Sequence, residues 1–420
     1  MSIIKKFADC VARMDEDNVS LQEYINQNSV KSVTDVEVKT GVDRMLYNHS
    51  LNKSQIAAVC GTTPPTLNLI EKKLLSSNAV NEPFSQGAST NYNRFDVAVF
   101  MNEFKVPKYS DRYDPMTISI MQHKGGSGKS TTTRTLATAA ALDLSLNANV
   151  VILDLDPQGS DALQCQPRGE DDVYLTIADI QLRDVEPDSP FYRYVEAYGL
   201  SNEDVVLSAA IPTHLPNLQI YPAFPDDERF TDFYHKLDEQ GQSTLLRQLV
   251  DFIIPILKKR YDLIFIDTPP QDSPIIWSAL KATDYMLTPL APKALDYMST
   301  KNFIRFTMDR IVQSGVSESL REWKVLPVMI DYNNRSHLMM MDRYRWVLAD
   351  RMFSNAIELS ELFYAADNLQ RTVYDIQKQE CKDNKYTSPN QYDLALKSST
   401  AVYTEFKNQL LLLAGKNRNK

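Results

Sequence analysis

A glycine-rich segment between an apolar run and an alanine-rich run most constrains how this chain folds. The segment reads Lys-Gly-Gly-Ser-Gly-Lys-Ser-Thr and occupies residues 124–131. The run at 118–121 before it predicts a strand, and the run at 132–144 after it predicts a helix. Such a loop holds phosphate, because successive backbone N–H groups and the positive helix end point at the anion. The pattern predicts that Lys129 reaches the β- and γ-phosphates and that the Ser130 hydroxyl holds Mg²⁺.

The first position of this loop departs from the common pattern G-x-x-x-x-G-K-[ST]. His123 stands where the first glycine is expected, and a second lysine, Lys124, follows it directly. The later glycine, Lys129 and Ser130 are all in place, so the prediction of a phosphate site stands. The additional lysine requires an explanation of its own.

Aspartates follow two further apolar runs that predict buried parallel strands. The first run, 150–153, is followed by Asp154 and Asp156, and the second, 263–266, by Asp267. Ligands of α/β proteins bind at the carboxyl edge of the sheet, where these acids are expected to lie. Asp267 matches the acid that holds Mg²⁺ in P-loop enzymes. The loop and two acidic strand ends, in this order, predict nucleotide binding.

Strand and helix patterns alternate through the rest of this region. Further strands are predicted at 218–221, 285–290 and 325–330, and helices at 245–259, 273–281 and 295–314. This alternation predicts an α/β fold of the P-loop NTPase type, with a mostly parallel sheet flanked by helices on both faces.

The segment before this core predicts a helix-turn-helix. Residues 54–60 and 64–73 have helical patterns, and a turn separates them. Ala57, Gly61 and Leu67 match the small residue, turn glycine and core residue of that motif. The alternative is a helical hairpin without a DNA-binding role. Under the first interpretation the DNA-facing residues are Thr62, Thr63, Thr66, Asn68, Lys72 and Lys73.

These patterns divide the chain into three parts. Residues 1–45 form a helical arm, for which the alternatives are packing on its own domain or dimerisation. Residues 46–114 hold the α-helical helix-turn-helix domain, a wing or a short strand and helix, and a linker. Residues 115–420 form the nucleotide-binding domain with C-terminal helices. The tail helix predicted at 392–414 is expected to dock on this domain, because its polar face lacks a row of cations.

The composition mainly excludes certain kinds of binding site and targeting segment. A formal net charge of −9 over 420 residues gives no general reason to expect nucleic acid, so only local clusters of charge could bind it. The four cysteines and five histidines show no metal-binding spacing, so the sequence predicts reduced thiols and no zinc site. The N-terminus lacks the apolar core of a signal peptide, and no run is long enough to span a bilayer. We therefore expect a cytoplasmic protein without a membrane partner.

Three motifs together resemble the deviant Walker A ATPases. They are residues 124–131, the Asp-Leu-Asp-Pro-Gln-Gly segment at 154–159 and the Ile-Asp-Thr-Pro-Pro segment at 266–270. The Pro-Gln-Gly ending is similar to the ParA branch, the DNA-partition ATPases. With a helix-turn-helix in front, the chain resembles the large ParA proteins of plasmids and second chromosomes. The resemblance covers about residues 115 to 400.

The resemblance implies a slow, Mg²⁺-dependent ATPase that hydrolyses ATP to ADP and phosphate. Lys124 corresponds to the signature lysine, which acts across a two-fold dimer on the partner's phosphates, and Asp156 to the acid that positions the attacking water. The catalytic residues are thus Lys124, Lys129 and Asp156, and the metal ligands are Ser130, Asp154 and Asp267. ATP would be bound by Lys124, Gly125, Gly126, Ser127, Gly128, Lys129, Ser130 and Thr131. Pro292 and Asn333 would lie near the base or at the dimer edge, and the alternative is that they belong to ordinary βα loops.

The resemblance to the ParA branch also implies a cellular role. The ATP-bound homodimer would bind nonspecific DNA cooperatively on the nucleoid, with filaments as one form, and a ParB-type partner would stimulate hydrolysis to drive plasmid or chromosome segregation. The basic residues Arg343, Arg345 and Arg351 are candidates for DNA contacts. Two alternatives remain open: a nucleotide-regulated transcriptional autorepressor, and a membrane-positioning ATPase of the cell-division type.

Overall fold

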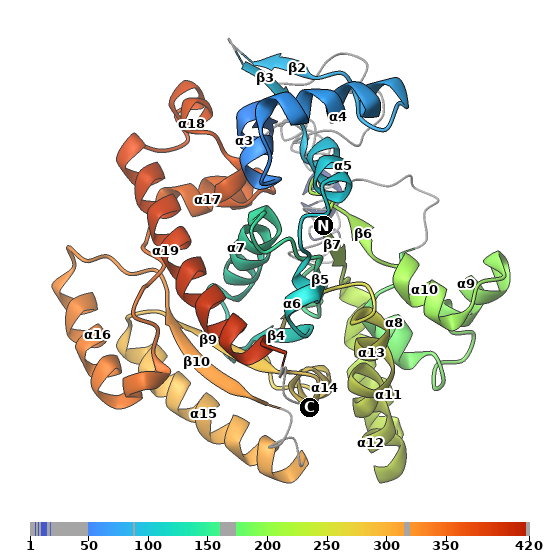
Figure 1. Ribbon diagram of the computed structural model, residues 1–420. Coiled ribbons are helices and arrows are strands. Elements are labelled where there is room, and N and C mark those ends of the chain that lie inside the picture. The colour runs from blue at the N-terminus through green and yellow to red at the C-terminus, as the bar shows by residue number, and fades with distance from the viewer. Residues whose placement is uncertain are drawn as a thin grey trace.

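The computed structural model describes residues 49–86, 89–159, 174–314 and 320–416, together with a few positions between residues 5 and 17. The predicted arm at 1–45 lies almost wholly outside these residues. Within them the chain forms a large α/β domain and a smaller N-terminal unit that packs against it (Figure 1).

A seven-stranded sheet forms the centre of the α/β domain. In the described part of the chain its order is β10-β9-β4-β8-β5-β7-β6, and every pair is parallel except β6 with β7. The mostly parallel sheet is therefore confirmed, and the antiparallel edge strand β6 was not predicted. The strands are β4 (Met116–Ile120), β5 (Val150–Asp154), β6 (Ile211–Pro212), β7 (Leu218–Tyr221), β8 (Leu263–Asp267), β9 (Tyr285–Leu290) and β10 (Glu322–Pro327).

Successive residues of the central strands face two separate cores, as the period of a strand requires. On β5, Val150 and Ile152 belong to one core and Val151 and Leu153 to the other. Because all four are buried, helices must cover both faces of the sheet, and Figure 1 shows helices on either side of it.

The first core packs α7 (Lys129–Leu142) and α19 (Pro389–Ala414) against the sheet. Val402, Phe406 and Leu410 of α19 are buried there, and Lys407 donates to the Asp143 carboxylate at 2.9 Å. The docking predicted for the tail helix is thus confirmed. Between β10 and α19 the chain also forms α16 (Arg335–Leu348), η5 (Ala349–Arg351), α17 (Glu361–Asn368), η6 (Val373–Asp375) and α18 (Lys378–Asn384).

The second core contains the helices between β5 and β9. The helix predicted at 245–259 is present but interrupted, because Pro255 cannot donate a backbone hydrogen bond and the π-helical segment η3 precedes it. The elements are α8 (Ile177–Leu182), α9 (Pro190–Tyr198), α10 (Asn202–Ser208), η2 (Pro225–Glu228), α11 (Arg229–Lys236), α12 (Glu239–Gln248), η3 (Leu249–Ile253), α13 (Ile254–Leu257) and α14 (Pro274–Lys281). The long helix α15 (Ala294–Ser314) follows β9.

The N-terminal unit, which we call the winged unit, spans residues 51–103. It contains β1 (Leu51–Asn52), α3 (Lys53–Val59), α4 (Pro64–Ser76), β2 (Phe84–Gln86), β3 (Ser89–Tyr92) and α5 (Arg94–Glu103). The strands pair antiparallel in the order β1-β3-β2, so the unit is mixed α and β. The strands β2 and β3 and the helix α5 lie where the sequence predicted a wing or a short strand and helix. Gly61, at a φ of 61°, makes the turn between α3 and α4. Thr63 stands at the N-cap of α4, but its hydroxyl pairs with the Thr66 hydroxyl and not with the backbone.

The winged unit docks on the α/β domain through Arg94. Its buried guanidinium donates to the carbonyls of Ala141 and Leu142, which end helix α7. A cation at this end of a helix satisfies carbonyls that have no partner within the helix. The segment predicted as a linker also contains α6 (Tyr109–Arg112), in which Tyr109 is fully buried. The connection to β4 is therefore packed on the domain.

Candidate nucleotide-binding site

The predicted phosphate loop joins β4 to α7. Gly126 and Gly128 have φ values of 67° and 81°, a region that side chains other than glycine rarely adopt. Gly128 is the N-cap of α7, so the positive end of this 14-residue helix opens onto the loop. A Cβ at Gly128 would also come within 3.4 Å of the Met329 methyl group. The loop thus has the backbone geometry of an anion cradle, as the sequence predicted.

One polar atom of the loop fits a bound phosphate directly. The Ser127 hydroxyl is buried and has no hydrogen-bond partner among the described residues. Buried polar groups are nearly always satisfied, so such an atom in a phosphate loop suits an oxygen ligand. The ring of His123, by contrast, packs against Phe303 and Phe306 of α15 at centroid distances of 4.9 and 4.7 Å. The residue in place of the first glycine therefore anchors the start of the loop to α15.

The two lysines of the loop lie in different environments. Lys129 is buried, and its ammonium donates to the Lys124 carbonyl at 3.3 Å. Burial lowers the pKa of Lys129, and the charges of Asp267 and Asp156 oppose that shift. Lys124 is only partly buried at the start of the loop. Lys129 can thus act within its own subunit, whereas Lys124 lies nearer the surface.

The acidic strand ends meet the start of α7. Asp154 and Asp267 are direct neighbours in the register of β5 and β8. The Ser130 hydroxyl donates to Asp267 at 2.6 Å, and the Thr133 hydroxyl donates to its other oxygen at 3.1 Å. Asp267 is fully buried, and this burial raises its pKa above the ordinary carboxyl range. A hydroxyl and carboxylates in contact are the oxygen ligands that Mg²⁺ prefers, so these residues fit the ion.

Asp156 lies two residues after Asp154, the last residue of β5, and is also buried. Its backbone N–H donates to Asp154 at 3.0 Å, and its carboxylate accepts from the Gln158 N–H at 3.1 Å. These hydrogen bonds fix the backbone of the Asp-Leu-Asp segment. The structure therefore brings together the predicted residues of the loop, β5 and β8.

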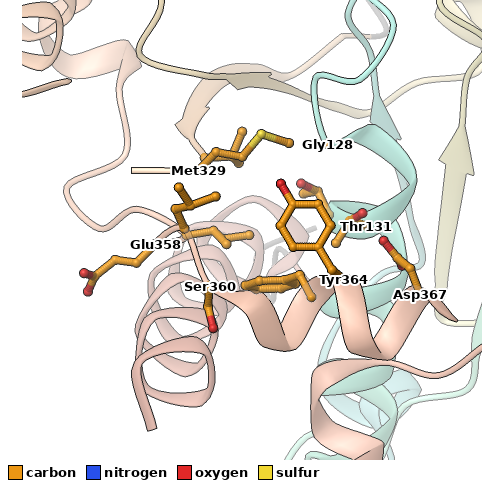
Figure 2. Close-up of a pocket in the computed structure, with 12 residues that line it drawn as sticks. Gly128, Thr131, Met329, Glu358, Ser360, Tyr364 and Asp367 are labelled. Carbon is orange, nitrogen blue, oxygen red and sulfur yellow. The ribbon is translucent and has the colours of Figure 1, made fainter. Parts of the chain in front are cut away.

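A cavity opens beside the loop. Figure 2 shows the side chains of Thr131, Met329 and Tyr364 around it. Its walls are largely apolar, and it adjoins the phosphate loop at Gly128. It thus suits a purine base. The lining residues are Gly128, Thr131, Thr132, Val328, Met329, Ile357, Glu358, Leu359, Ser360, Phe363, Tyr364 and Asp367.

The two residues predicted to lie near the base, Pro292 and Asn333, do not line this cavity. Pro292 is buried after β9, and Asn333 is exposed in a turn held by Asp331. The chain bends sooner than expected, at Met329 with a φ of 56°, and the opposite wall comes from residues 357–364. Met329 and Tyr364 line the cavity, and the placement of Pro292 and Asn333 near the base stays a prediction. The positive φ of Met329 has no sequence signal, and the wall at 357–364 is too distant in sequence to be inferred.

The predicted DNA contacts do not form one surface. In the winged unit Thr63, Thr66, Asn68 and Lys72 are exposed and Thr62 is half-buried, while the exposed Lys73 pairs with Glu103 at 2.6 Å. On the far side of the sheet, Arg345 pairs with Asp342, and Arg351 with Glu322 and Asp350. Arg343 is exposed on α16. Figure 1 shows α4 and α16 well apart.

The sequence of this chain is similar to those of known proteins. The family model AAA_31, described as an AAA domain, matches residues 116–321. A putative replication protein A of Rhizobium rhizogenes is 24% identical over 69% of this chain and 67% of its own length. Plasmid partition protein A of Escherichia coli is 27% identical over 47% of this chain and 48% of its own length, so the match spans about half of that relative.

A solved structure titled Partition Protein shares the fold. It superimposes with a TM-score of 0.62 at 18% identity, covering 88% of this chain and 94% of that one. Among the described residues, no helix has both the length and the apolar character needed to cross a membrane.

Proposed function

We propose that this chain, whose residues 116–321 match the AAA_31 family model and whose sequence is similar to that of plasmid partition protein A, is an ATP-dependent DNA-partition protein. Its ATP-bound homodimer binds nonspecific DNA, and hydrolysis releases it. A ParB-type partner bound at a centromere-like site stimulates that hydrolysis. The resulting cycle segregates a plasmid or a chromosome.

The observation that carries this proposal is the convergence of three distant segments at the start of α7. The phosphate loop, the Asp154–Asp156 segment and Asp267 meet around Ser130, whose hydroxyl contacts the Asp267 carboxylate. ATP and Mg²⁺ are the cofactors of this site. Ser130, Asp154 and Asp267 hold the ion, which neutralises charge on the phosphates when it is bound. The base lies against Met329 and Tyr364.

The tasks proposed for the catalytic residues come from the resemblance to the deviant Walker A ATPases, and the position of each residue is compatible with its task. Lys129, at the start of α7, neutralises charge on the β- and γ-phosphates within its own subunit. Asp156 orients the attacking water, because its carboxylate follows the metal-binding strand end and its backbone is fixed by Asp154. Lys124 lies nearer the surface, from which it contacts the phosphates of the partner subunit in the dimer. A lysine supplied by the partner makes assembly and hydrolysis depend on each other.

DNA binding then follows from assembly. A dimer doubles the number of basic side chains that meet one duplex, and each neutralised phosphate adds to the affinity. Lys72 on α4 and Arg343 on α16 are the candidates among the exposed basic residues of the predicted sets. The protein would associate with the nucleoid in its ATP-bound form.

The test is a gel shift on a nonspecific duplex with ATP, with ADP and without nucleotide. We expect strong retardation with ATP and weak retardation in the other two conditions. The Asp156→Ala variant should hold the ATP-dependent complex without turnover, whereas Lys129→Ala should show no response to ATP. Equal binding in all three nucleotide states would contradict the proposal.

One observation favours a second role as a nucleotide-regulated autorepressor. Arg94 connects the winged unit to the end of α7, the helix that begins at the phosphate loop. Footprinting on the DNA upstream of the chain's own coding sequence, with ADP and with ATP, tests this role. Protection of one site in ADP that changes with ATP would support it, and uniform protection would exclude it. We do not propose a membrane-positioning role, because the apolar residues of α19 are buried against the sheet.

A further inference from the structure

We propose that His49, His214 and Asp375 form a binding site for a zinc-class divalent cation that joins the winged unit to the ATPase domain. The three residues come from separate parts of the fold. His49 lies two residues before β1 of the winged unit, His214 lies between β6 and β7, and Asp375 ends η6. No part of the nucleotide site contributes to this cluster.

The ligand atoms converge on one point. The Nε2 atoms of His49 and His214 each lie 2.8 Å from the same oxygen, Oδ1 of Asp375. The two imidazole rings are 5.7 Å apart, and all three ligand atoms lie within 4.8 Å of one another. Two imidazole nitrogens and one carboxylate oxygen are a ligand set that zinc uses, with a fourth position left for solvent.

The carboxylate is held ready for a cation. Its other oxygen, Oδ2, accepts from the backbone N–H of Thr372 at 2.9 Å and from the Thr372 hydroxyl at 2.6 Å. Such bonds to the oxygen that does not ligate orient the group in metal sites. These two hydrogen bonds therefore fix the direction of the carboxylate.

Local movement would turn this geometry into a metal complex. Zinc bonds of about 2.0–2.2 Å at tetrahedral angles place neighbouring N and O ligands roughly 3.3 Å apart. Each Nε2–Oδ1 distance, now 2.8 Å, would thus lengthen by about half an ångström, and the two nitrogens, which lie within 4.8 Å of each other, would settle at a similar separation. Both side chains are about one-tenth exposed, at 13% and 11%, so a cation can enter from solvent.

A cation bound at this cluster would join distant parts of the chain. His49 and Asp375 are 326 residues apart in sequence, and His214 and Asp375 are 161 apart. A cation bound to all three would fix the start of the winged unit against an edge of the sheet and the C-terminal helices. Because the unfolded chain lacks this arrangement, cation binding stabilises the folded junction.

The experiment is a zinc titration of the untagged full-length protein against a chromophoric chelator, with Mg²⁺ in large excess to occupy the nucleotide site. We expect one zinc per chain, removed by His49→Gln or His214→Gln with a loss of affinity of about 100-fold. Glutamine keeps an N–H for Asp375, so these variants retain a hydrogen bond and should fold. His235→Gln, which changes an exposed histidine, is the matched control and should bind zinc as the wild type does.

Thermal unfolding gives a second measurement. Zinc should raise the unfolding temperature of the wild type and of His235→Gln but not of either cluster variant. Nucleotide binding by each variant verifies its fold independently. Affinity weaker than about 100 μM, or affinity unchanged by the cluster substitutions, would leave a hydrogen-bonded junction only and overturn the proposal.

Discussion

The nucleotide site and the winged unit were both predicted from short local patterns, yet they differ in how their functional residues are held. In the nucleotide site, side chains from three distant segments contact each other, as Ser130 does with Asp267. In the winged unit, the predicted DNA-facing residues of α4, which are Thr66, Asn68, Lys72 and Lys73, are exposed on the surface. In the first region the side chains of one chain already converge, whereas in the second the proposed DNA contacts would converge only on a duplex. Substitutions should therefore have large effects in the first and graded effects in the second.

The largest effect is expected for Lys129→Ala. Loss of a buried, charge-assisted hydrogen bond to phosphate should lower ATP affinity by about 100-fold or more, as measured by calorimetry. Lys72→Ala removes an exposed lysine of the winged unit and should leave ATP affinity unchanged. Equal effects of the two substitutions would remove the distinction between the regions.

Asp156→Asn should separate binding from turnover. Hydrolysis should fall about 100-fold because the water is no longer oriented by a carboxylate, while ATP affinity stays within a few-fold of the wild type. Phosphate release measures the first quantity and calorimetry the second. Asp226→Asn, at an exposed acid, serves as the control. Retained turnover in Asp156→Asn would refute its assignment.

A smaller, salt-dependent effect is expected on α4. Lys72→Glu should weaken DNA binding by about tenfold at low salt and by less at high salt, because it removes a phosphate contact and adds repulsion. Lys73→Glu should weaken it less, since Lys73 is already paired with Glu103. Gel shifts over a salt series measure both. If the two substitutions weakened DNA binding equally, the ion pair between Lys73 and Glu103 would not affect how Lys73 binds DNA.

The smallest effect concerns the stability of the nucleotide-free protein. Burial raises the pKa of Asp267, so the folded state binds this proton more tightly than the unfolded state does. Ionised Asp267 therefore lowers the free energy of unfolding at pH values above its folded-state pKa. This destabilisation disappears as the pH falls through the mildly acidic range and the carboxyl group takes up a proton in both states. Thermal unfolding of Asp267→Asn and wild type should differ most at neutral pH and converge on acidification. A difference independent of pH would contradict the pKa direction.

The sequence predicted those elements that a local pattern specifies. The apolar runs of β4, β5, β8 and β9 are buried on both faces and give a continuous signal, and the loop glycines mark the turn into α7. For the same reason the site residues from the loop, β5 and β8 lie together as expected: parallel strands end at one edge of the sheet.

Contacts between distant segments were not predictable in this way. The short edge strand β6 depends on pairing with β7, and the cavity wall at 357–364 depends on how the chain returns after α16. The contact of Arg94 with α7 has no local signal either. The five histidines looked scattered, yet His49 and His214 meet at Asp375 because three remote segments converge there.

The central claim is that ATP switches assembly through Lys124. Light scattering on the wild type and Lys124→Ala, each with ADP or a nonhydrolysable ATP analogue, tests it most directly. The account predicts a dimer only for the wild type with the analogue, while Lys124→Ala binds the analogue within a few-fold of the wild-type affinity and stays monomeric. A dimer of Lys124→Ala that forms with the analogue as readily as the wild type would contradict the cross-subunit role.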